Sequence, residues 1–191
     1  MKESPSNYNR IGMTLGQRGR FIQAIEAFER AIELKPDFAP AHHNLGLAWW
    51  HLGHTERAIA AYERAIMLDP TNPEPYCGLG QALASLGRHA EAADTLRRAV
   101  VAAPGSHKAL FNLGLAAERV LEWEEAAVAY RRSVDLNPLR PEARVRLARL
   151  CLFVLDRPQE AIESLTCALE NAPEDDRVRA ALDEALELVI R

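Results

Sequence analysis

The sequence predicts an all-α fold in which pairs of helices repeat along the chain as a solenoid. Four prolines and four glycines recur 34 residues apart, at Pro36, Pro70, Pro104 and Pro138 and at Gly12, Gly46, Gly80 and Gly114. The same step separates four alanines, each followed four residues later by a large side chain, in the pairs Ala24 and Phe28, Ala58 and Tyr62, Ala92 and Leu96, and Ala126 and Tyr130. A period in this range is typical of tandem helix pairs.

Apolar spacing predicts two helices in each unit. In the second unit Leu45 and Trp49 share one helical face, and Ala58 and Tyr62 share a face further along. Small residues recur where the two helices would cross, so we expect Gly46 and its equivalents to let the helices approach closely. A bulky side chain there would cost about 1–3 kcal/mol through overpacking.

The turns between the expected helices are also visible in the sequence. Gly53 and Gly87 each follow a helical segment, where a left-handed residue commonly ends a helix. Between units, Asn72 suits an N-cap and Pro73 suits a first helical turn.

Together these offsets make the chain resemble a tetratricopeptide-repeat protein. The match is clearest where Leu45 and Gly46 are followed by Ala58, Tyr62 and Pro70. The resemblance implies a right-handed α-solenoid superhelix of antiparallel helix pairs. It also implies that the first helices of successive repeats line a concave inner face.

We expect one continuous domain over residues 1–191. Its repeats are predicted at 5–38, 39–72, 73–106, 107–140 and 141–175, followed by a capping helix at 176–191. The fifth repeat departs from the pattern, because Ala148 replaces the glycine and Arg144 occupies the aromatic place. One residue is also inserted between Arg149 and Leu155, which leaves the register after Arg149 open.

Composition excludes several classes of function. A net charge of −4 argues against nucleic-acid binding, and no apolar run is long enough to span a membrane. The three cysteines lack a CxxC pair, and the six histidines form no HExxH motif, so neither a disulfide framework nor a metal site is indicated. We expect a cytoplasmic protein without a cofactor, and no motif indicates an enzyme.

The resemblance assigns side chains to the concave groove and implies that they bind a peptide of a client protein. These predicted groove residues are His43, Asn44, Leu47, Trp50, Gln81, Lys108, Phe111, Asn112, Leu115, Arg146 and Arg149.

Trp50 and Phe111 suggest the walls of a recess for an apolar side chain. The alternative is that Trp50 folds over its neighbours and fills the groove. Asn44 and Asn112 occupy the same place in two repeats, where tetratricopeptide domains hold a peptide backbone with asparagine; the alternative is that they are solvated.

Arg146 and Arg149 share a helix face and, with Lys108 and Asn112, could receive a carboxylate. The alternative is that Arg146 pairs with Glu142 while the other arginines pair with the acidic C-terminal segment.

Two functions of different classes remain at this point. The first is an adaptor that binds a client peptide in the groove. The second is a structural assembly subunit that packs through its end or its convex face. No cap precedes Tyr8, so the first repeat frays, packs on a second copy of the chain, or is covered by sequence outside this chain.

Overall fold

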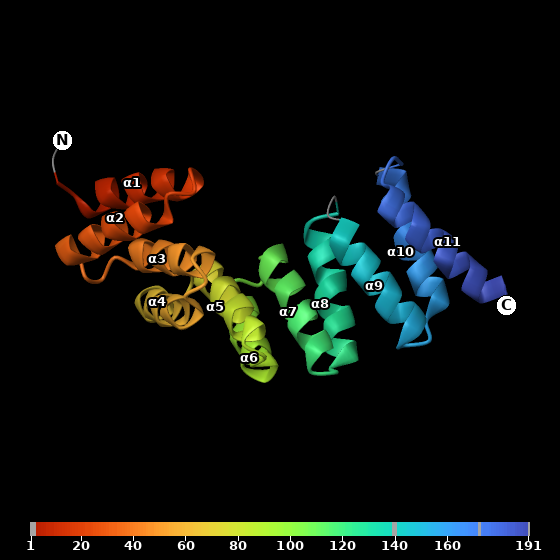
Figure 1. Ribbon diagram of the computed structural model, residues 1–191. Coiled ribbons are helices and arrows are strands. Elements are labelled where there is room, and N and C mark those ends of the chain that lie inside the picture. Colours follow the sequence, from red (N-terminus) through yellow and green to blue (C-terminus); the bar gives the residue numbers. More distant parts are fainter. Residues whose placement is uncertain (1–2, 139–140, 172, 191) are drawn as a thin grey trace. The chain divides into compact units, whose positions relative to one another are not determined.

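The computed structural model describes residues 3–138, 141–171 and 173–190, and within these ranges every regular element is an α-helix (Figure 1). Helices α1–α6 are Pro5–Gln17, Phe21–Leu34, Ala39–His51, Thr55–Leu68, Pro73–Ser85 and His89–Ala102. Helices α7–α11 are His107–Arg119, Trp123–Leu136, Pro141–Phe153, Pro158–Asn171 and Asp176–Ile190. The first helix of each predicted repeat therefore begins where the sequence placed it.

The chain divides into two compact units, Met1–Pro104 and Gly105–Arg191, here called unit 1 and unit 2. In unit 1 each odd-numbered helix packs against its even-numbered partner, and α3 also contacts both α1 and α5. In unit 2, α7 pairs with α8, α9 pairs with α10, and α11 contacts both α9 and α10. In unit 1 the first helices are therefore adjacent, as in stacked helix pairs, and in unit 2 α9 packs between the α7–α8 pair, through α8, and α11.

The turns form as the sequence predicts. The side chain of Asn72 accepts a hydrogen bond from the backbone N–H of Glu74, and Pro73 begins α5. Gly53 and Gly87 have positive φ angles of 78° and 76°, which end α3 and α5 without the strain that a side chain would add. Leu121, with φ 64°, occupies the equivalent place in the fourth repeat.

The small residues at the helix crossings are in close contact with the large residues of the paired helices. A Cβ atom added to Gly46 would lie 2.8 Å from the ring of Tyr62, and one added to Gly114 would lie 2.5 Å from the ring of Tyr130. Both tyrosine side chains are fully buried. The repeated glycine thus gives the aromatic ring of the next helix its space, as predicted.

The fifth repeat keeps its register despite the inserted residue. Helix α9 has 13 residues, the same length as α7, and the turn that follows it is one residue longer than the turn after α7. Asp156 in this turn adopts a positive φ of 52°. The extra residue therefore lies in the turn after Phe153 and does not distort the helix.

Polar side chains tie the start of several first helices to the preceding turn. His42 Nε2 lies 2.9 Å from the carbonyl oxygen of Pro36, and the Tyr76 hydroxyl donates to the carbonyl of Pro70 at 3.2 Å. The fifth repeat has the same bond from an arginine: Arg144 is 7% exposed, and its Nε donates to the carbonyl of Pro138 at 3.4 Å.

Helix α11, at the place of the expected cap, packs against α9 and α10 of the fifth repeat. Val178, Ala181 and Ala185 are buried on its inner side, whereas Leu186, Leu188 and Val189 remain 40–45% exposed. No described helix combines the length and the apolar character that crossing a bilayer requires.

Candidate functional site

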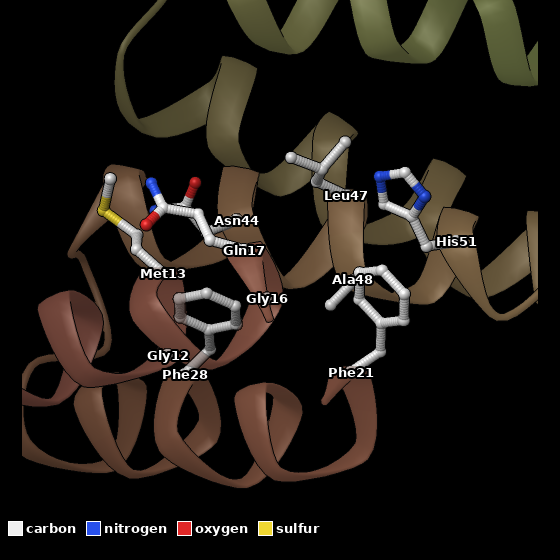
Figure 2. A pocket seen from close by; sticks show the side chains of 10 residues that line it. All are labelled: Gly12, Met13, Gly16, Gln17, Phe21, Phe28, Asn44, Leu47, Ala48 and His51. Carbon is white, nitrogen blue, oxygen red and sulfur yellow. The ribbon is translucent and has the colours of Figure 1, made fainter. Parts of the chain in front are cut away.

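The side of unit 1 formed by its first helices carries an apolar pocket (Figure 2). The pocket has a volume of about 260 Å³ and lies between α1, α2 and α3. Its lining residues are Gly12, Met13, Gly16, Gln17, Phe21, Phe28, Asn44, Leu47, Ala48 and His51. Two of these, Asn44 and Leu47, are predicted groove residues. We call this site the apolar pocket.

The lining of the apolar pocket combines open space with fixed walls. Nothing lies within 4 Å of a Cβ atom added to Gly16, so this glycine leaves room for a guest side chain. Phe21 and His51 stack with their ring centroids 4.7 Å apart and 11° between their planes. Figure 2 shows this pair at one end of the pocket and Asn44 near the other.

Asn44 joins the first two repeats. Its Nδ2 donates to Asn9 Oδ1 at 2.9 Å, and Asn9 is itself only 9% exposed. The bond fixes the orientation of the Asn44 amide at the pocket wall.

Unit 2 carries a second pocket with a different chemistry. Its volume is about 430 Å³, and its lining residues are Glu118, Trp123, Val145, Arg146, Arg149, Leu150 and Val154. The two predicted arginines are therefore brought together here, on α9 beside α7 and the start of α8. We call this site the basic pocket.

A chain of hydrogen bonds orients one arginine in the basic pocket. The buried Tyr130 hydroxyl donates to Glu118 Oε1 at 2.7 Å, and Arg146 Nη1 lies 3.3 Å from Glu118 Oε2. Burial, followed by the bond to Glu118, raises the pKa of Tyr130, so its hydroxyl stays protonated and remains a donor.

The ion pairs of unit 2 correct the predicted alternative. Arg146 pairs with Glu118 rather than with Glu142, because Glu118 on α7 faces it across the basic pocket. Glu142 instead lies 3.5 Å from Arg177 of α11. Arg131 pairs with Glu160 of α10, which also lies outside the acidic C-terminal segment.

The remaining predicted groove residues line neither pocket. In unit 1, His43 and Trp50 are half-buried and Gln81 is exposed. In unit 2, Phe111 and Leu115 pack against the core, and the ring of Phe111 lies 5.8 Å from that of Tyr130. Trp50 and Phe111 belong to different units, so the predicted recess between them stays a prediction.

Two further predicted residues lie on α7. Lys108 is half-buried. Asn112 is 7% exposed, and its buried Nδ2 has no hydrogen-bond partner among the described residues. Leaving a buried donor unpaired costs about 1–3 kcal/mol, which makes this amide a candidate to bind an additional acceptor.

Sequence reasoning missed two aromatic walls. Phe21 in the apolar pocket and Trp123 in the basic pocket are the first residues of α2 and α8. They occupy the same place in the first and fourth repeats, where the second and third repeats have Thr55 and His89. An aromatic residue at the start of the second helix is therefore a signal that could have found both.

Metal chemistry finds no support in the parts of the chain that the structure describes. No group of three or more His, Cys, Asp or Glu side chains there is arranged to hold a metal ion. Both pockets offer apolar and hydrogen-bonding surface.

Known proteins agree with this architecture. Two tetratricopeptide repeat models match the chain, one over residues 9–73 and 111–176 and the other over residues 50–113. No curated protein matches it.

Solved structures of repeat proteins share the fold. TTC0263 from Thermus thermophilus is 26% identical with a TM-score of 0.68, covering 96% of this chain and 99% of its own. A MamA structure from Desulfovibrio magneticus is 23% identical with a TM-score of 0.75, covering 92% and 99%. YrrB, described as a TPR protein with an unusual peptide-binding site, is 20% identical with a TM-score of 0.70, covering 91% and 89%.

Tetratricopeptide proteins bind other proteins and are generally non-enzymatic scaffolds. One family model matches more than half of the 191 residues, and the helix pairs have the expected bounds and contacts. This chain therefore belongs to the tetratricopeptide repeat family.

Proposed function

We propose that this protein is an adaptor that binds a peptide segment of a client protein along the sides formed by its first helices. The observation that carries the proposal is the apolar pocket, where Asn44 and Leu47 meet the open space beside Gly16. An apolar side chain of the client would enter this space, and Asn44 and Gln17 would bind the adjacent peptide backbone. Burying one such side chain contributes about 1.5–3 kcal/mol.

Filling the pocket tests the proposal. The Gly16→Leu variant adds a side chain at a position where a Cβ atom has no neighbour within 4 Å, and leucine is a better helix former than glycine. A phage-displayed library of short random peptides would be selected on the wild-type protein, and the peptides recovered would then be measured on the variant. We expect peptides that share an apolar residue, with about tenfold weaker binding to Gly16→Leu.

Ala60→Leu is the matched control, because Ala60 is exposed on α4 and lies outside both pockets. This variant should bind the selected peptides as the wild type does. Equal binding by Gly16→Leu, or no enrichment of any peptide on the wild type, would contradict the proposal.

Self-association is the second candidate function. It is favoured by the exposed apolar residues Leu186, Leu188 and Val189 on α11. Sedimentation of the wild type and a Leu188→Glu variant distinguishes the two functions. An oligomer that Leu188→Glu dissociates, with no peptide bound, supports assembly over peptide capture.

A further inference from the structure

We infer that the basic pocket of unit 2 binds the side-chain carboxylate of an Asp or Glu residue inside the client peptide, next to an apolar residue. This inference rests on the proposed function and adds the chemistry of the ligand at a second anchor. The evidence for this inference is the charge balance, the hydrogen bonds and the apolar walls of the basic pocket.

The basic pocket contains one more cation than anion. Arg146 and Arg149 line it together with a single carboxylate, Glu118. Glu118 is already engaged by the Tyr130 hydroxyl and by Arg146. Arg149 is exposed and pairs with no carboxylate among the described residues. An incoming carboxylate would therefore meet a guanidinium group that is still available, with Arg146 beside it.

Arg146 is held in place before any ligand binds. The Glu118 side chain is 22% exposed, and its Oε1 accepts a hydrogen bond from the buried Tyr130 hydroxyl. Its Oε2 lies 3.3 Å from Arg146 Nη1 and so orients the guanidinium group. A side chain that is already ordered loses less conformational entropy on binding. The Tyr130–Glu118–Arg146 chain thus prepares the pocket for an anion rather than neutralising it fully.

Apolar side chains form the remaining walls. Trp123, Val145 and Leu150 are half-buried or buried, and Val154 is 44% exposed at the rim. Such walls exclude water and strengthen a charge-assisted hydrogen bond. They also give a neighbouring apolar residue of the ligand a surface to cover.

The cavity beyond Arg146 indicates that the acidic residue lies within the peptide and not at its end. A smaller pocket of about 150 Å³, lined by Pro141, Glu142, Val145, Arg146 and Arg177, shares Val145 and Arg146 with the basic pocket. A peptide that fills both pockets continues past Arg146 on either side. The carboxylate that reaches Arg149 then belongs to a side chain.

The apolar pocket provides an internal comparison. Asn44, Leu47 and Gly16 occupy the places in their repeats that Arg146, Arg149 and Glu118 occupy in theirs. Both pockets have an aromatic wall from the start of a second helix. The basic pocket is therefore the same kind of site with its neutral residues replaced by charged ones, which points to a charged ligand.

Two pools of short synthetic peptides test the inference. Both are acetylated and amidated, so that side chains carry the only carboxylates, and they differ in a fixed central Glu or Gln within otherwise random, uncharged sequence. Retention on the immobilised full chain is measured by mass spectrometry. We expect about tenfold more retention of the Glu pool at low salt, and a smaller difference at about 500 mM NaCl.

Arg149→Gln should remove most of the preference for the Glu pool. Arg132→Gln, at an exposed arginine on α8 outside the pocket, should leave it unchanged. Because both arginines are exposed, circular dichroism should show that both variants keep the wild-type helix content.

Other outcomes overturn the inference in distinguishable ways. Equal retention of the two pools, with retention still sensitive to Gly16→Leu, would refute the carboxylate anchor and leave the proposed function intact. If the Arg149→Gln variant still prefers the Glu pool, the basic pocket is not the site that binds the carboxylate. If the Gln pool synthesised with a free C-terminal carboxylate is retained as well as the amidated Glu pool, the pocket binds a chain end, contrary to the inference. If neither pool is retained and the phage selection enriches no peptide, both the inference and the proposed function are wrong.

Discussion

At the scale of single residues, a hydrogen bond from the fourth residue of a first helix to a proline carbonyl recurs through the fold. His42, Tyr76 and Arg144 each lie within hydrogen-bond distance of the proline carbonyl six residues earlier. The equivalent residue of α11, Arg179, bonds the carbonyl of Pro173 in the same way. The bond satisfies a backbone acceptor in the turn between repeats and fixes where the next helix begins.

Removing one of these donors should destabilise the protein measurably. Tyr76→Phe deletes the hydroxyl that donates to Pro70 but keeps the ring, which is 3% exposed and lies beneath Arg98. We expect the free energy of unfolding to fall by about 0.5–1.5 kcal/mol. Urea denaturation followed by circular dichroism measures the change.

Tyr8→Phe is the control, because the Tyr8 hydroxyl bonds the exposed carboxylate of Glu3. Its effect should be much smaller. Equal losses in the two variants would show that the proline carbonyl adds nothing specific.

This hydrogen bond to the proline carbonyl was only partly predictable from the residue types at its position. The sequence marks Arg144 as a departure from the aromatic place, yet the structure shows Arg144 making the same bond as Tyr76. The pattern of residue types could not predict this result. What the two residues share is a side-chain hydrogen-bond donor long enough to reach the proline carbonyl six residues earlier. For the same reason, nothing in the sequence predicted that Glu118 rather than Glu142 pairs with Arg146.

At the scale of helices, the bounds follow directly from prolines, glycines and caps. Pro5, Pro73 and Pro141 begin α1, α5 and α9, and Gly19, Gly53 and Gly87, with positive φ angles, follow the ends of α1, α3 and α5. These residues act locally through backbone geometry, so their effect is readable without knowledge of the tertiary fold. The position of the inserted residue after Phe153 could not be predicted in this way, because the sequence is compatible with a longer helix as well as with a longer turn.

Two alanines of α11 test whether this helix stabilises unit 2. Ala185 is 0% exposed, whereas Ala180 is exposed on the same helix. Ala185→Asp would bury an unpaired carboxylate and should lower the free energy of unfolding by about 2–4 kcal/mol. Ala180→Asp should change it by less than about 1 kcal/mol, the difference in helix propensity.

Urea denaturation of both variants gives the comparison. Hydrogen exchange should also show faster opening of α10 in Ala185→Asp, because α10 packs against α11. Unchanged stability of Ala185→Asp would mean that α11 is not an integral part of unit 2.

At the scale of the whole molecule, the division into two compact units bears on the predicted single domain. Each repeat contacts mainly its neighbours, and the stability of such arrays is approximately a sum of repeat and neighbour terms. We therefore expect residues 1–104, produced alone, to fold with helices α1–α6. Circular dichroism and thermal unfolding measure this.

The isolated segment should also keep peptide binding that is sensitive to Gly16→Leu, because the whole apolar pocket lies within unit 1. The preference for the Glu pool should be lost, since the basic pocket lies in unit 2. An unfolded 1–104 segment would instead support one cooperative domain that needs all five repeats.

The candidate site was predictable in part at this scale. The repeat pattern identified which helices present Asn44, Leu47, Arg146 and Arg149, because the period fixes the face of each helix. It could not show where these residues would meet an open space. That depends on Gly16, whose surroundings are known only once α1, α2 and α3 are packed together.

The two pockets lie at corresponding places, one between repeats one and two and the other between repeats four and five. The eight residues that set their chemistry are Gly16, Phe21, Asn44, Leu47, Glu118, Trp123, Arg146 and Arg149. None of the eight is buried, whereas the alanines that pack the helices are. Duplicating adjacent repeats therefore copies a pocket together with its supporting framework. Later substitutions at the eight positions can change what each copy recognises while the framework that folds the chain is inherited intact.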